Sequence, residues 1–224
     1  AGSRGMSGAA ALAAASALRS GAGVVVLGTP ASVAPVLDRK LTEVMVEALP
    51  ETSRGTLSLD AFEEIQDRLR WADLVILGPG LSRDPETVLF VRRCLSRIRL
   101  PMLIDADGLN ALAGSSSLVG RKSRELLITP HAGELARLPG TTPAAVEHDR
   151  VAAARESAKK FRLTLLLKGA PTLVSDERGA LYVNPTGNPG MATAGAGGVL
   201  SGCIGVLWGQ GMERTEAAYA GAYV

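Results

Sequence analysis

The stretch "PMLIDADGLN", Pro101 to Asn110, decides the fold class. Its first half is apolar throughout, as a strand covered on both faces is, and acidic residues begin where such a strand would end. Similar apolar runs recur along the chain and predict further strands of the same kind. The expected strands are Val24–Gly28, Glu43–Leu49, Asp73–Gly78, Pro101–Asp105, Glu125–Pro130 and Leu163–Gly169.

Segments with helical spacing alternate with these strands, which predicts an α/β sandwich around a mainly parallel sheet. Asp84 stands before Pro85, the order typical of a helix N-cap followed by a proline in the first turn. The alternation of strands and helices ends near the C-terminus, where Ala170–Asn184 has the pattern of a β-hairpin that turns at Asp176–Gly179. The expected helices are Gly8–Gly21, Asp84–Ile98 and Thr142–Phe161.

The composition predicts one folded domain that binds neither nucleic acid nor a membrane. The chain has 224 residues, of which 46% are hydrophobic, enough for one substantial core. Its 24 basic and 22 acidic residues nearly cancel, and the cluster Arg92, Arg93, Arg97 and Arg99 is typical of a solvated helix face. The longest uncharged run, Gly179–Met212, is interrupted by prolines, asparagines and many glycines, which disfavours a membrane span.

The two cysteines, Cys94 and Cys203, lie far apart in apolar surroundings. Neither belongs to a Cys-x-x-Cys pair or to the cysteine and histidine spacing of a zinc site. We therefore expect buried free thiols in a reducing cytoplasm, and the absence of a secretory segment fits the same location.

Polar residues and glycines follow four of the expected strands, at the edge where parallel sheets bind ligands. These segments are "GPGL" (Gly78–Leu81), "DADGLN" (Asp105–Asn110), "TPHAGE" (Thr129–Glu134) and "KGAPT" (Lys168–Thr172). Most have a structural explanation as well: a tight turn, a helix cap, a structural histidine or a first-turn glutamate. The lysine ends an apolar strand and favours anion binding, because a bare ammonium is costly there.

The glycine-rich stretch Asn184–Gly211, "NPTGNPGMATAGAGGVLSGCIGVLWGQG", leads into an apolar run typical of a buried helix. Glycine this dense before a helix allows backbone N–H groups to come close to a ligand, and phosphate is the usual one. We therefore expect the N–H groups of Gly195–Gly198 to form an anion hole at the start of that helix.

In combination these motifs resemble the ribokinase-like superfamily, and within it the NAD(P)H-hydrate dehydratases, which restore hydrated nicotinamide cofactors. The resemblance covers nearly the whole chain in order, from "AGSRGMSGAAALAAASALRSGAG" (Ala1–Gly23) to "GNPGMATAGAGGVLSG" (Gly187–Gly202). It implies a three-layer ribokinase-like sandwich, with residues 1–224 as a single domain trimmed at both ends. It also implies a homo-oligomer, often a tetramer, in the cytoplasm.

The resemblance further implies roles for individual residues. The hydrated cofactor would contact Ala9, Gly80 and His131, and Glu134 would help to organise a magnesium ion through water. ADP or ATP would be the co-substrate, with ADP favoured by the bacterial look of the match. The nucleotide would be held by Lys168, Gly169, Ala170, Pro171, Thr172 and Gly197.

The implied reaction is phosphorylation of the ring hydroxyl and then elimination of phosphate, because phosphate leaves more readily than hydroxide. The family carries its base in a Gly-x-Gly-Asp pattern, but this chain reads "GAGG" and has Gly198 at the base position. A glycine accepts no proton, so we expect turnover to fall by about a hundredfold to ten-thousandfold. Three explanations stay open: a substitution that traps a complex, a natural inactive homologue, or a base supplied elsewhere, with Asp107 as the candidate.

Two other classes of function stay open. A non-catalytic nucleotide-binding protein would keep the anion hole and lack turnover. A ribokinase-like small-molecule kinase would release a stable phosphorylated product, but such kinases usually carry asparagine where this chain has His131.

Overall fold

The computed structural model describes residues 1–114 and 125–224. Its central feature is a six-stranded sheet with the order β3-β4-β5-β6-β7-β8. Strands β3 to β6 are parallel, and β7 and β8 add an antiparallel hairpin, as the sequence predicts. The strands are β3 (Val75–Leu77), β4 (Met102–Ile104), β5 (Leu126–Ile128), β6 (Thr164–Leu167), β7 (Leu173–Ser175) and β8 (Leu181–Val183).

A second, two-stranded parallel sheet is formed by β1 (Val26–Pro30) and β2 (Met45–Leu49). The sequence predicts one sheet, but β1 and β3 are edge strands of separate sheets in the part of the chain that the structure describes. The strand expected at Val24–Gly28 is shifted by two residues. Val24 is exposed, so apolar character alone placed the start too early.

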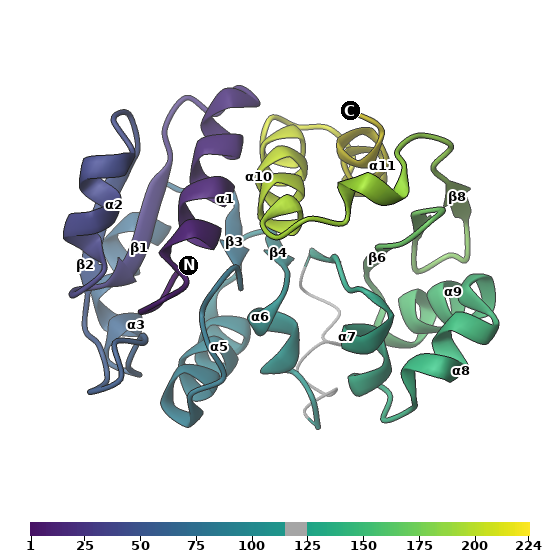
Figure 1. The fold of residues 1–224 in the computed structure, drawn as a ribbon, viewed down its shortest axis with the longest axis horizontal. Helices are drawn as coiled ribbons and strands as arrows, with labels where there is room; N and C mark the ends of the chain where they lie inside the picture. Colours follow the sequence, from purple (N-terminus) through teal and green to yellow (C-terminus); the bar gives the residue numbers. More distant parts are fainter. Residues whose placement is uncertain (115–124) are drawn as a thin grey trace.

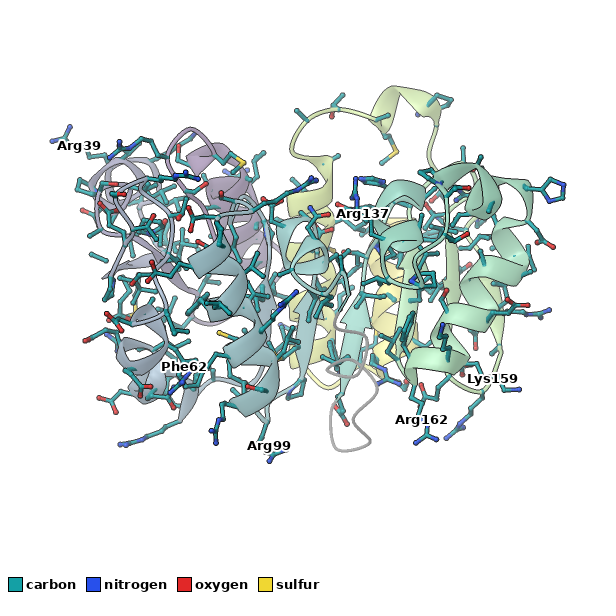
Figure 2. All side chains as sticks on the ribbon, turned by 90° about the horizontal axis from the view of Figure 1, so that it is seen from below. Arg39, Phe62, Arg99, Arg137, Lys159 and Arg162 are labelled. Atoms are coloured by element: carbon teal, nitrogen blue, oxygen red, sulfur yellow. The ribbon has the colours of Figure 1, made fainter. Side chains whose placement is uncertain are left out.

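Helices cover both faces of the six-stranded sheet and give the fold three layers (Figures 1 and 2). Successive strand residues point to opposite faces. Leu77 and Ile104 therefore pack with Phe90 on one face. Leu103 packs with Trp208 on the other. The three-layer sandwich predicted from the sequence is confirmed.

The helices divide between these faces and the small sheet. One face of the large sheet carries α3 (Ala61–Glu64), α4 (Gln66–Leu69), α5 (Pro85–Arg97), α7 (Ala132–Arg137), α8 (Pro143–His148) and α9 (Arg150–Phe161). The other face carries α10 (Ala196–Gly209) and α11 (Arg214–Tyr223). Helices α1 (Ser7–Arg19) and α2 (Ala34–Lys40) pack on β1, and the short α6 (Asp107–Asn110) and η2 (Pro189–Met191) lie in connections.

The helix boundaries test the sequence signals. Asp84 caps α5 as predicted, since its Oδ1 accepts from Glu86 N at 3.0 Å. The single helix expected over Thr142–Phe161 is wrong, because the chain breaks at Asp149, which has a φ of −141°. The side chain of Asp149 accepts from Ala152 N at 2.9 Å and caps α9 instead. Aspartate competes for backbone donors in this way and favours caps over helix interiors.

Helix α10 lies against α1, and glycines make the close approach possible (Figure 1). A Cβ atom on Gly202 would lie only 2.4 Å from Ala13 O. A Cβ atom on Gly198 would lie 3.2 Å from Ala9 O. The backbones of α1 and α10 are therefore in near contact at both glycines, and Gly198 lies in the first turn of α10.

Two expectations from the composition can be compared with the fold. Both thiols are free, and Cys94 is buried, whereas Cys203 is half-buried. Burial raises the pKa of the Cys94 thiol to about 12, so this thiol stays protonated. Across residues 1–114 and 125–224, the helices are too short or too polar to cross a membrane.

Candidate active site

Parallel pairing brings the carboxyl ends of β4, β5 and β6 to one edge of the sheet. Asp105 directly follows β4, His131 begins α7 shortly after β5, and Lys168 directly follows β6. Lys168 N donates to Pro130 O at 2.8 Å, which holds the last two loops side by side. The polar residues that follow the predicted strands therefore lie together at the carboxyl edge of the sheet.

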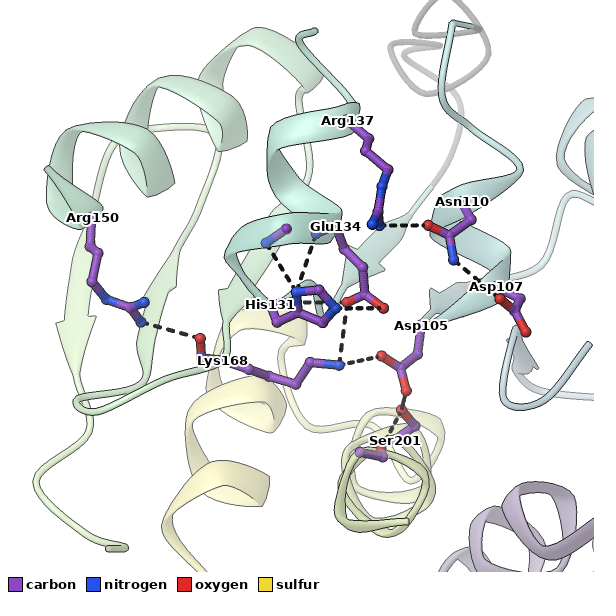
Figure 3. Close-up of polar contacts among 11 residues, drawn as sticks. Asp105, Asp107, Asn110, His131, Glu134, Arg137, Arg150, Lys168 and Ser201 are labelled. Atoms are coloured by element: carbon purple, nitrogen blue, oxygen red, sulfur yellow. Dashed lines mark hydrogen bonds and ion pairs between the residues drawn. The ribbon is translucent and has the colours of Figure 1, made fainter. Parts of the chain in front are cut away.

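Lys168 lies at the centre of a charged group (Figure 3). Its Nζ donates to Asp105 Oδ1 at 2.7 Å and lies 3.6 Å from Glu134 Oε2. The Lys168 side chain keeps 23% of its exposure, whereas the side chains of Asp105 and Glu134 keep 3% and 8%. Two buried carboxylates thus fix the ammonium in place, while one side of it stays open to an incoming anion.

Asp105 connects this group to the start of α10. Ser201 Oγ lies 3.0 Å from Asp105 Oδ2 and 2.9 Å from Gly197 O, within hydrogen-bond distance of both. A Cβ atom on Gly197 would lie 3.5 Å from Asp105 Oδ2 and 3.6 Å from Lys168 Nζ. Gly197 therefore leaves open space directly in front of the Asp105–Lys168 pair.

The first turn of α10 has backbone donors without helical acceptors, as every helix start does. Gly195 is its N-cap, has a φ of +96°, and offers no side chain to cap the helix. The positive φ favours glycine at this position, and a Cβ atom there would also lie 2.3 Å from Leu12 Cδ1. Ala196 N donates to Thr193 O at 3.3 Å, so the next N–H groups of the turn, beside the Lys168 ammonium, are those that can hold a phosphate group.

Arg150, at the start of α9, clamps the loop of the "KGAPT" motif. Its Nη2 donates to Lys168 O at 3.3 Å and to Pro171 O at 3.1 Å. Gly169 has a φ of +152°, and a Cβ atom there would lie 2.3 Å from Arg150 Nη2. The Ala170–Pro171 peptide bond is cis. Residues 169–171 are exposed, so the loop presents its surface to solvent while its base is held.

His131 and Glu134 form a capping box at the start of α7. His131 Nδ1 accepts from Gly133 N at 3.0 Å and from Glu134 N at 3.3 Å. Glu134 Oε2 accepts from His131 N at 2.9 Å. The imidazole Nε2 lies 3.5 Å from Glu134 Oε1, and the side chain of His131 is 55% exposed. The pair thus has a structural role, and the outer edge of the ring remains accessible.

Ala9, Gly80 and Gly198 meet beside the first half of α1. Gly80 has a φ of +67°, and a Cβ atom there would lie 3.1 Å from Ala9 Cβ. Gly198 is buried and faces Ala9 O. We call these three residues the glycine side of the site, and Asp105, His131, Glu134 and Lys168 the charged side. The neighbours Gly197 and Gly198 face the charged side and the glycine side respectively.

Asp107, the alternative base suggested by the sequence, is engaged elsewhere. Its Oδ2 accepts from Ser82 N at 2.9 Å, and its Oδ1 accepts from Asn110 Nδ2 at 3.1 Å. These bonds hold the loop after β3 against α6. The carboxylate that lies beside Gly197 is Asp105, and its two oxygens already face Lys168 and Ser201.

Within the described ranges, no group of three histidine, cysteine or acidic side chains converges where a metal ion could sit. Glu134 is already in contact with His131 and Lys168 through both carboxylate oxygens. Glu134 therefore has little capacity left to ligate a metal ion directly, and contact through water is the arrangement that its side chain would fit.

Sequence reasoning missed the roles of three residues. Asp105 stood in a motif that was interpreted as a possible helix cap, and the signal was its place directly after a buried strand. Ser201 is one turn into an apolar helix, and nothing in the sequence indicates that it would face Asp105. Arg150 is one of many arginines, and its contact with the Lys168–Thr172 loop depends on tertiary packing.

Comparison with known proteins gives consistent results over the whole chain. A profile of the NAD(P)H-hydrate dehydratase family matches residues 1–224. The bifunctional NAD(P)H-hydrate repair enzyme Nnr of Moorella thermoacetica is 48% identical over 223 residues, which are 100% of this chain and 42% of that protein. The ADP-dependent (S)-NAD(P)H-hydrate dehydratase of Neisseria meningitidis is 38% identical over 226 residues, 100% of this chain and 72% of the relative. The chain therefore spans less than half of the bifunctional relative.

A solved structure has the same fold. It is the ADP/ATP-dependent NAD(P)H-hydrate dehydratase from Bacillus subtilis, co-crystallized with ATP/Mg²⁺ and soaked with CoA. The TM-score is 0.78 at 27% identity, and the match covers 99% of this chain and 77% of the other.

Proposed function

The chain belongs to the NAD(P)H-hydrate dehydratase family, and we propose that it restores NADH and NADPH from their hydrated forms with ADP or ATP as phosphate donor. The observation that carries this proposal is the position of Lys168 beside the uncapped start of α10. An ammonium and free backbone N–H groups on one open space suit a nucleotide phosphate.

The nucleotide would lie on the charged side. Its phosphates would face Lys168 and Gly197, and the exposed Gly169–Pro171 surface, together with Thr172, would contact the rest of the nucleotide. Arg150 keeps this loop in place through the carbonyls of Lys168 and Pro171. A loop that is rigid before binding loses less entropy when the ligand arrives.

The hydrated nicotinamide would lie on the glycine side, against Ala9 and Gly80, with the exposed edge of His131 as a further contact. Gly197 and Gly198 are neighbours in the chain, so a phosphate at the first and a ring hydroxyl at the second would be adjacent. Reactants held side by side lose no further translational entropy before they react, and such positioning is a large part of phosphoryl-transfer catalysis.

The proposed chemistry has two steps. The ring hydroxyl attacks the terminal phosphorus of the nucleotide, its proton passes to a base, and the shortened nucleotide leaves. The phosphorylated ring then expels phosphate, and loss of the neighbouring proton forms the double bond of the dihydronicotinamide. Magnesium bound with the phosphates would neutralise charge that develops on the transferring group.

The first step lacks a base in this chain at the position where the family has its aspartate. Gly198 is buried and packs against Ala9 O, and no carboxylate stands at this position. We therefore propose that the chain binds both ligands and turns over slowly.

Recovery of reduced nicotinamide absorbance tests the proposal. The chain is incubated with hydrated NADH, magnesium ion and either ADP or ATP, and rates are compared with those of Gly198→Asp. Slow recovery in the chain and fast recovery in the variant supports the proposed function. No recovery in either protein contradicts it. ADP is the donor that we expect to be preferred.

A non-catalytic nucleotide-binding role is the second candidate, and the glycine at position 198 is the observation that favours it. Calorimetric binding of ADP without any turnover of hydrated NADH or NADPH would select this role. Absence of ADP binding would exclude it.

We also propose a homo-oligomer, with a tetramer as the expected form, and a cytoplasmic location. Both rest on the family resemblance. Light scattering of the purified chain tests the first, and fractionation of producing cells tests the second.

A further inference from the structure

Thr129 is a buried threonine directly after β5, at the edge of the sheet that carries the charged side. Only 1% of its surface is exposed, and its Oγ1 has no hydrogen-bond partner within residues 1–114 and 125–224. A buried hydroxyl without a partner lowers stability, because it has given up its bonds to water. The free chain by itself therefore gives no reason for a hydroxyl at this position.

Thr164, at the start of β6, is an equally buried threonine whose hydroxyl has partners. Its Oγ1 accepts from Arg214 Nε at 2.8 Å and lies 3.1 Å from Thr215 Oγ1. The two threonines belong to the same sheet and differ in whether the hydroxyl is bonded. Thr164 is therefore the internal reference for Thr129.

Strand pairing places Thr129 beside Asp105. Ile104 of β4 pairs with Ile128 of β5, and Thr129 N donates to Ile104 O at 3.2 Å. Asp105 and Thr129 are the next residues of these two strands, so they are neighbours across the sheet.

Both side chains belong on the face of the sheet that α10 covers. Leu103 and Leu127 lie two residues before Asp105 and Thr129, and both pack in the cluster of Trp208. Residues two apart in a strand share a face, so Asp105 and Thr129 point the same way as these leucines. The contact of Asp105 with Ser201, a residue of α10, agrees with this direction.

The Thr129 hydroxyl is too deeply buried to meet a ligand itself, but Asp105 connects it to a group that can. Asp105 Oδ1 accepts from Lys168 Nζ at 2.7 Å, and the ammonium is the group that would face a nucleotide phosphate. If the ammonium turns toward phosphate, Asp105 Oδ1 loses its donor. A buried carboxylate oxygen without a donor is costly, so the movement of Lys168 would be opposed.

We propose that Thr129 is a positioning residue for nucleotide binding, whose hydroxyl donates to Asp105 when Lys168 turns to the phosphate. Adjacent strands are about 4.8 Å apart, so rotation about one side-chain bond brings the hydroxyl to the carboxylate. Asp105 then keeps a donor before and after the nucleotide binds, and Lys168 is free to move. This role rests on the proposed function, because it requires a phosphate in front of Lys168.

Calorimetric titration with ADP tests the role on two variants of Thr129. Thr129→Val removes the hydroxyl and keeps the shape, so the Kd for ADP should rise by about tenfold. The melting temperature of the free chain should stay the same or rise, because no bond is lost. Thr129→Ser keeps the hydroxyl and loses a buried methyl group, so it should melt earlier and bind ADP as the unsubstituted chain does.

Two further proteins control this test. Thr164→Val removes a bonded hydroxyl, so its melting temperature should fall while the Kd for ADP stays unchanged. Lys168→Ala/Thr129→Val should bind ADP with the same Kd as Lys168→Ala, because without the ammonium there is no exchange of donors.

Three results would overturn the role of Thr129 and leave the proposed function standing. The first is equal ADP affinity in Thr129→Val and the unsubstituted chain. The second is an equal loss of affinity in Thr129→Val and Thr129→Ser, which would assign the effect to packing of the methyl group. The third is a loss in Thr129→Val that persists when Lys168 is alanine. If the unsubstituted chain does not bind ADP at all, the proposed function fails together with this role.

Discussion

The charged side and the glycine side of the site meet at two neighbouring residues, yet they are built in opposite ways. The charged side has an ammonium fixed by two buried carboxylates, with Lys168 Nζ 2.7 Å from Asp105 Oδ1. The glycine side is formed by backbone and methyl groups, and Gly198 packs closely against Ala9 O. The difference teaches that a fixed charge and a close backbone contact can stand side by side at the start of one helix. In the proposed function the charged side would bind phosphate, and the glycine side lacks a side chain that could accept a proton.

Gly198→Asp should produce the largest change, because it places a carboxylate on the glycine side. A general base contributes about a hundredfold to ten-thousandfold, so kcat for hydrated NADH should rise by that factor. The new Cβ would lie 3.2 Å from Ala9 O, which requires only a small shift of α1. Steady-state absorbance assays measure the rate.

Gly197→Asp is the matched control for position. Its Cβ would face Asp105 Oδ2 and Lys168 Nζ instead of α1. We expect no gain in kcat and weaker nucleotide binding, because the new charge would repel phosphate. An equal gain in both variants would contradict the assignment of the two glycines to different sides.

Lys168→Ala should break the charged side with the next largest effect. A hydrogen bond to a charged group contributes about 1.5–3 kcal/mol, so the Kd for ADP should rise by about tenfold to a hundredfold. Titration calorimetry measures it, with the exposed Lys160→Ala as the control. If ADP binds both variants equally well, Lys168 does not hold the nucleotide.

Much of the fold was predictable because strand ends and helix caps are local signals. The apolar run before Asp105, the cap at Asp84 and the hairpin near Gly179 all depend on residues close in sequence. That β1 and β3 belong to separate sheets was not predictable, because a hydrophobic pattern indicates where strands lie and not which strands pair. The break at Asp149 was missed because the residues on both sides of it favour helix.

Asp105→Asn should have a smaller effect, and mainly on folding. The amide can still contact Lys168 and Ser201, but the ammonium loses a charged partner. We expect the free energy of unfolding to fall by about 1–2 kcal/mol. Urea denaturation measures this loss, and the exposed Asp67→Asn is the control, since its ion pair with Arg70 lies in solvent.

The same Asp105 variant also separates a positioning role from a purely structural one. A positioning role predicts a higher KM for ADP in Gly198→Asp/Asp105→Asn than in Gly198→Asp alone, with kcat little changed. Loss of stability without any change in KM would restrict Asp105 to folding.

The buried Ala1 amine, which donates to Gly28 O at 2.9 Å, should make stability rather than activity depend on pH. The Ala1 amine has a pKa of about 5 in the folded chain and an ordinary value of 8.0. Between these values the unfolded chain binds more protons, so stability should rise from pH 5 to pH 8 by less than about 1.4 kcal/mol per unit. Thermal unfolding across this range measures it. An N-acetylated chain should lose this contribution, and an unchanged pH slope would show that the amine is not its source.

The site residues that belong to a local sequence motif were predictable. Those that reach the site only through tertiary packing were not. Lys168 was found because a charge at the end of a buried strand is unusual, whereas Glu134 was named only through the family resemblance, since a first-turn glutamate is ordinary. Ser201 and Arg150 were missed because they reach the site from helices packed against it. The sequence grouped His131 with the substrate contacts, and in the structure its ring lies beside Glu134. Its contact with substrate stays a prediction.

The capping box of His131 decides what this ring can offer a ligand. Because Nδ1 accepts from two backbone N–H groups, the neutral ring carries its single proton on Nε2. The accessible edge is therefore a hydrogen-bond donor and has no lone pair with which to take a proton. In the proposed complex His131 would orient an oxygen of the substrate, but it would not replace the carboxylate that position 198 lacks.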